Sequence, residues 1–175
     1  KDTVADFLKK KGFVYFSLSD IIRKECYKIN QETTRENLIN MGNKLRIKYG
    51  ESYLARQVLK KINEKNIKKA LAVSIRHPKE VKEFRKDTNF FLITVNGPQK
   101  IRFLRTQKRK NRPEDKDSFR EFKEHEERER KGRGHKQQLD KIAKMADFRI
   151  INKGTLRDLY KKIEKIIIKI NEKTK

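Results

Sequence analysis

Apolar residues recur every three or four positions over the last part of the chain, with lysines between them. The members of this stripe are Leu156, Leu159, Tyr160, Ile163, Ile166, Ile167 and Ile170. A period close to 3.6 residues predicts an amphipathic helix whose apolar face packs against a core. Gly154 and Thr155 precede the stripe and are typical of a turn into a helix.

Short apolar runs alternate with helical patterns along the rest of the chain. Strands are predicted at residues 13–17, 70–75, 90–95 and 148–151. Between them, apolar residues at helical spacing predict helices, one of which begins after Thr34 as N-cap and ends at Gly50. Alternation of strands and helices favours an α/β fold with a parallel sheet. We expect a single domain over residues 1–175.

The region between Arg105 and Lys136 has few apolar residues besides Phe119 and Phe122. Ser118 and Glu121 have the spacing of a capping box, which marks the start of a helix. This region is therefore predicted to be a charged, solvated helical excursion.

The composition limits the partners and the setting of the protein. A formal net charge of +24 favours a polyanionic partner, but the lysines are spread over every predicted helix, which equally fits a general surface composition. Basic and aromatic residues are not interleaved, so specific nucleic-acid recognition has little support. Cys26 is the only cysteine, and no apolar run is long enough to span a bilayer. We expect a soluble, cytoplasmic protein without membrane contact.

Four arginines form the first candidate site. Arg102, Arg105 and Arg109 are spaced for one face of a helix, and Arg112 follows them. Guanidinium groups in this arrangement can hold phosphoryl oxygens and stabilise charge during phosphoryl transfer. The alternative is a solvated basic face, which the spacing alone favours.

Polar residues that follow two of the predicted strands form the second candidate site. Asp20 and Arg23 follow the first strand, and Arg76 follows the second. Open α/β sheets bind ligands beyond the carboxyl ends of their strands. The alternative for Asp20 is an N-cap. The three histidines lack metal-ligand spacing, so no metal site is predicted.

Five segments resemble, in order, the P-loop nucleoside-monophosphate-kinase-like proteins. They are KDTVADFL, FSLSDIIRKE, RENLINMGNKLR, SIRHPKEVKEFR and ADFRIINKGTLRDLYKKI. The resemblance is to deoxynucleoside monophosphate kinases, dephospho-CoA kinases and the kinase-like domains of some deoxycytidylate deaminases. It implies a three-layer α/β fold with a helical lid over about residues 111–136, and fusion or association with a deaminase domain. It also implies a chain truncated at the phosphate-binding loop, without the first strand and most of that loop.

The resemblance implies a role for each matching residue, with ATP and Mg²⁺ as cofactors. The residues expected to bind ATP are Lys1, Asp2, Thr3, Arg105 and Arg112. Those expected at the acceptor nucleotide are Asp20, Arg23, Arg35, Asn43, Arg46 and Arg76. Those expected to be catalytic are Lys1, Asp20, Arg105 and Arg109.

The expected function is ATP-dependent phosphoryl transfer to a small nucleotide-type acceptor, such as a nucleoside monophosphate or a dephospho-CoA-like molecule. One alternative is a catalytically silent nucleotide-sensing domain. It is favoured by Val73, which stands where members of the resembled family commonly have an acidic residue. The other is a basic nucleic-acid-binding protein, which the net charge favours.

Overall fold

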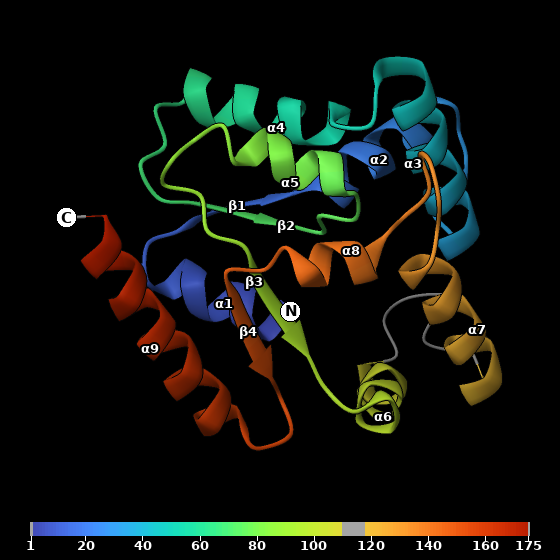
Figure 1. The fold of residues 1–175 in the computed structure, drawn as a ribbon. Coiled ribbons are helices and arrows are strands. Elements are labelled where there is room, and N and C mark those ends of the chain that lie inside the picture. Colours follow the sequence, from blue (N-terminus) through green and yellow to red (C-terminus); the bar gives the residue numbers. More distant parts are fainter. Residues whose placement is uncertain (1, 110–117, 175) are drawn as a thin grey trace.

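The computed structural model describes residues 2–109 and 118–174 and shows a mixed α/β fold (Figure 1). Its elements in chain order are α1 (Asp2–Lys10), β1 (Val14–Ser17), α2 (Leu18–Lys28), α3 (Arg35–Tyr49), α4 (Tyr53–Glu64), β2 (Ala70–Val73), α5 (Pro78–Phe84), β3 (Ile93–Asn96), α6 (Gln99–Arg109), α7 (Phe119–Arg130), α8 (Leu139–Lys144), β4 (Phe148–Ile151) and α9 (Leu156–Lys173). The predicted alternation of strands and helices is confirmed.

The strands form two parallel pairs. β1 pairs with β2 in the register Val14 to Ala70, and β3 pairs with β4 in the register Ile93 to Phe148. Parallel strands require a crossover between them, and here each crossover contains helices. The predicted parallel pairing is confirmed, but the described strands form two separate sheets rather than one continuous sheet.

One core lies on the side of β1 and β2 that is covered by α2, α4 and α5 (Figure 1). Its fully buried side chains include Leu18, Leu54 and Val58, and Phe84 closes it from α5. Phe16 of β1 and Ala72 of β2 pack against this cluster. One face of β1 and β2 packs on this core, and this packing positions the loop that follows β2.

A second core lies between α1, α9 and side chains of β2, β3 and β4. Ile163 of α9 and Leu8 of α1 are buried in it, and Ile150 joins from β4. Leu71 packs here while its neighbour Ala72 packs in the first core, as expected where alternate residues of a strand point to opposite faces. The predicted amphipathic helix at the end of the chain is confirmed, including a capping box between Thr155 and Asp158.

α6 and α7 lie together at the side of the molecule away from α9 (Figure 1). Phe103 of α6 contacts both Phe119 and Phe122 edge to face. Phe122 and Glu129 are the buried residues of α7, and apart from Phe119 the rest of that helix is polar and largely exposed. The predicted charged helical excursion and the Ser118–Glu121 capping box are confirmed, although residues 110–117 lie outside the described part of the chain.

Several predicted boundaries change by a few residues. The strand predicted at 90–95 begins at Ile93, because Phe90 turns into the first core and stacks on Phe84. α2 begins at Leu18 with Ser17 in the N-cap position, so Asp20 lies inside the first turn and is not the N-cap. Within the described residues no helix combines the length and apolar content that crossing a membrane requires.

Replacing Ile163 by Ala is expected to lower the free energy of unfolding by about 2–5 kcal/mol, because the side chain is fully buried and its removal leaves a cavity. Ile168→Ala on the same helix is the matched control. Its side chain is 57% exposed, so the change should stay within about 0.5 kcal/mol. Urea unfolding measures both, and equal losses would contradict the assigned buried face of α9.

Candidate functional site

A buried ion pair fixes the loop between β2 and α5. Arg46 of α3 donates from Nε and Nη2 to Oε1 of Glu80, at 3.1 and 2.9 Å. The other carboxylate oxygen accepts from the backbone N–H groups of Arg76 and His77, at 2.8 and 3.0 Å. Both side chains of the ion pair are almost fully buried. Glu80 therefore holds α3, α5 and the Arg76 backbone together.

His77 joins this loop to the segment that follows α7. Its Nδ1 accepts from the backbone N–H of Lys79 at 3.2 Å, which caps α5. Nε2 then carries the proton and donates to the carbonyl oxygen of Gly134 at 2.8 Å. Gly134 has a φ of +56°, a conformation that glycine adopts without steric cost. The histidine is a capping residue, and it is buried.

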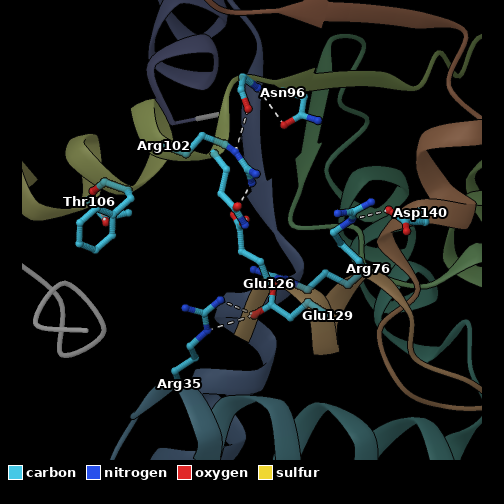
Figure 2. A network of polar contacts seen from close by, with 12 residues as sticks. Arg35, Arg76, Asn96, Arg102, Thr106, Glu126, Glu129 and Asp140 are labelled. Carbon is cyan, nitrogen blue, oxygen red and sulfur yellow. Dashed lines mark hydrogen bonds and ion pairs between the residues drawn. The ribbon is translucent and has the colours of Figure 1, made fainter. Parts of the chain in front are cut away.

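Two arginines from separate elements converge on one carboxylate (Figure 2). Arg35, the first residue of α3, donates from Nε and Nη2 to Oε1 of Glu129, at 3.1 and 2.9 Å. Arg76 donates from Nη1 to Oε2 of Glu129 at 2.6 Å and to Oε1 of Gln137 at 2.8 Å. The Glu129 side chain is only 10% exposed. We call Arg35 and Arg76 the arginine pair.

The charge state of Glu129 follows from two opposing effects. Burial raises the pKa of its carboxyl group, but the positive charges of Arg76 and Arg35 and their hydrogen bonds lower it by more. The pKa of Glu129 consequently lies below its usual range, and the group is an anion at neutral pH. The arginine pair thus already holds a negatively charged oxygen group.

The arginines predicted to share one face of α6 do not all meet at one site. Arg102 donates from Nε to the Gly97 carbonyl at 3.0 Å and forms an ion pair with Glu126 of α7, which also accepts from Gln99 (Figure 2). Arg105 is exposed on α6 and Arg109 is its last residue. Arg112 lies outside the described residues.

The other predicted acceptor residues have local roles. Asp20 and Arg23 form an exposed ion pair with each other at 3.1 Å, three residues apart on α2. Arg46 is not available to a ligand, because its guanidinium group is buried against Glu80, and this part of the prediction is wrong. Asn43 is half-buried on α3, and its Oδ1 has no hydrogen-bond partner among the described residues.

The predicted residues at the start of the chain are only partly described. Asp2 and Thr3 open α1, with Asp2 exposed and Thr3 half-buried. Lys1 lies outside the described residues. The structure therefore brings together Arg35 and Arg76 from the predicted set, and adds two carboxylates that sequence reasoning missed, Glu80 and Glu129. The spacing of Glu80, three residues after the N-cap His77, is the one local signal that could have found either of them.

Replacing Glu80 by Gln is expected to destabilise the protein by about 3–5 kcal/mol, because Arg46 would be left as a buried charge without a counter-ion. Glu64→Gln, which removes an exposed ion pair with Lys60, should cost less than about 1 kcal/mol. Chemical denaturation measures both free energies. A loss for Glu80→Gln as small as that of the control would contradict the central position given to this ion pair.

The Glu129 interaction predicts a pH dependence of stability. The pKa of Glu129 is lower in the folded protein than in the unfolded chain. The charged carboxylate therefore contributes its full stabilisation above the usual glutamate pKa of about 4.3, and this stabilisation is lost as the pH falls through that value toward the folded pKa. The stability difference between wild type and Glu129→Gln should be full at pH 7 and shrink below about pH 5. Glu124→Gln, at an exposed site on α7, should show little difference at any pH. A Glu129→Gln difference that stays constant down to about pH 3 would refute the charge assignment.

Comparison with known proteins gives relatives along almost the whole chain. A UPF0200 protein of Pyrococcus horikoshii is 30% identical in an alignment of 175 positions that covers 97% of this chain and 91% of the relative. A UPF0200 protein of Staphylothermus marinus is 29% identical, covering 99% of this chain and 88% of the relative. A UPF0200/UPF0201 protein of Archaeoglobus fulgidus is 33% identical, and the chain spans about half of its length. No protein-family model matches.

These relatives correct the family assignment. Their names contain no kinase, and they match at about 30% identity over nearly the full chain, so assignment to the P-loop nucleoside-monophosphate-kinase-like family is wrong. The expectation of a chain truncated at a phosphate-binding loop and the expected deaminase association rested on that resemblance and lose their basis with it. The chain belongs to the UPF0200 family.

Proposed function

We propose that the chain binds the phosphate group of a small nucleotide-type ligand at the arginine pair and transfers a phosphoryl group from ATP to that ligand. One observation carries the proposal. The guanidinium groups of Arg35 and Arg76 come from different elements and aim their N–H groups at the same carboxylate, Glu129. A position that holds one anion through two guanidinium groups suits another anion of similar geometry.

Phosphate fits this donor arrangement for two reasons. Guanidinium forks bind phosphate and carboxylate oxygens through parallel, charge-assisted hydrogen bonds. A phosphate monoester also offers three oxygen acceptors and close to two negative charges at neutral pH, where a carboxylate offers two oxygens and one charge. The arginine pair can therefore bind a phosphate monoester more strongly than a carboxylate of equal mobility.

The surrounding structure holds the arginine pair in place before a ligand arrives. Glu80 fixes the Arg76 backbone through its N–H group, and the backbone carbonyl of Arg76 accepts from Gln138 at 2.9 Å. Arg35 begins α3 directly after Thr34, whose side chain caps that helix. Preorganised donors lose little conformational entropy on binding, which favours affinity.

The positive net charge of the chain supports ATP as the phosphoryl donor of the proposed reaction. ATP with Mg²⁺ is the phosphoryl donor that the family resemblance implied, and a net charge of +24 independently favours binding of its phosphates. Arg105, exposed on α6, is a candidate contact for them. The described residues contain no cluster of three metal-binding side chains. Magnesium would consequently arrive with the ATP phosphates, which commonly supply much of its coordination.

A silent nucleotide-sensing domain is the second candidate. β2 ends at Val73, immediately before the loop that carries Arg76, and this residue offers no carboxylate to organise a metal ion. Such a domain would bind the same ligands without turnover. Incubation with ATP, Mg²⁺ and a nucleoside monophosphate, followed by separation of the nucleotides, distinguishes the two candidates by whether the added monophosphate is converted to its own diphosphate while ATP becomes ADP.

The binding prediction is tested by isothermal titration calorimetry with nucleoside monophosphates. Arg35→Lys and Arg76→Lys keep the positive charge but lose the fork, so each should weaken binding by about tenfold or more. Arg120→Lys, at a side chain that is 89% exposed on α7, is the matched control and should bind like wild type. Unchanged affinity in both arginine-pair variants would show that the phosphate binds elsewhere, and binding to nucleic acid alone would favour the polyanion alternative.

A further inference from the structure

Glu129 stands in the position that the proposed phosphate would need. It lies on α7, whereas Arg35 and Arg76 lie on α3 and on the loop after β2. Its two oxygens accept three hydrogen bonds from the arginine pair, at distances between 2.6 and 3.1 Å. Because a phosphate would use the same N–H groups, the carboxylate and the phosphate cannot both occupy the pair.

We propose that Glu129 is an internal competitor of the ligand, so that phosphate binding at the arginine pair releases the last turns of α7 from the body of the protein. This inference rests on the phosphate site proposed above. Glu129 and a phosphate bound to the same N–H groups would be adjacent like charges that repel each other, which makes their occupancies mutually exclusive. Ligand affinity and α7 docking are thereby linked.

The attachments of α7 support such a release. Its buried residues are Phe122, which packs on α6, and Glu129, which contacts the arginine pair. Glu126 binds Arg102 of α6, and Arg130 binds Asp140 of α8 through an ion pair that is largely exposed. Of the contacts described for α7, the one to α3 and the β2–α5 loop is made by Glu129. Loss of this contact frees the end of α7 from that side while its apolar contact with α6 remains.

The fraction of molecules in which α7 is docked determines how far Glu129 weakens phosphate binding. If the docked form outweighs the released form by tenfold, the apparent affinity for phosphate is about tenfold weaker than that of the open arginine pair. An attached carboxylate competes at a high effective concentration, so a free phosphate at low concentration is at a disadvantage. The inhibition disappears when the negative charge of Glu129 is removed.

The test uses the whole chain and inorganic phosphate as the probe. Glu129→Gln should bind phosphate at least about tenfold more tightly than wild type, and Glu129→Asp, which keeps the charge on a shorter side chain, should fall between them. Glu127→Gln is the matched control, because Glu127 lies on the same helix and pairs only with a nearby exposed lysine in the contacts described. It should bind phosphate like wild type.

Hydrogen exchange gives an independent readout of the same coupling. In wild type, saturating phosphate should speed amide exchange over residues 126–130, whereas in Glu129→Gln exchange there should already be fast and unaffected by phosphate. If Arg76→Lys weakens phosphate binding but Glu129→Gln does not strengthen it, the competitor role is refuted and the phosphate site stands. If no variant binds phosphate, both proposals fail.

Discussion

The buried ion pair between Arg46 and Glu80 is the interaction on which the arrangement of the candidate site depends. It crosses from α3 to α5, and the second oxygen of the carboxylate holds the backbone of Arg76 and His77. A buried charge is tolerated only when its counter-ion and its hydrogen bonds are in place, and here the groups satisfy one another. This pair sets the position of Arg76 relative to Arg35, since both arginines are attached to elements that it connects.

The buried carboxylates described in this positively charged chain share one arrangement. In the part of the chain that the structure describes, Glu80 and Glu129 are the buried acidic residues, and each lies against arginine. The difference between them is exposure: the Glu80 pair is closed to solvent, while Arg35 and Arg76 remain 20% and 27% exposed. The first pair is therefore structural, whereas the partial exposure of the second supports the proposal that its carboxylate exchanges for an anion from solution.

The sequence predicts the elements better than the site. Hydrophobic periodicity locates α9, and the Ser118–Glu121 spacing locates the start of α7, because both signals are local. The division of the strands into two pairs is a matter of long-range hydrogen bonding that no local pattern encodes. Arg35 and Glu129 are 94 residues apart, so spacing gave no sign that they meet. Arg46 was expected at a ligand because of the family resemblance, and its partner Glu80, 34 residues away, could not be assigned to it from the sequence.

The most direct test of the account is a crystal structure of the protein with a nucleoside monophosphate. We expect the phosphate group between Arg35 and Arg76, in hydrogen-bond contact with both guanidinium groups, with Glu129 displaced from them and the Arg46–Glu80 pair unchanged. A structure in which the nucleotide is bound elsewhere while Glu129 keeps its contacts with both arginines would contradict the account.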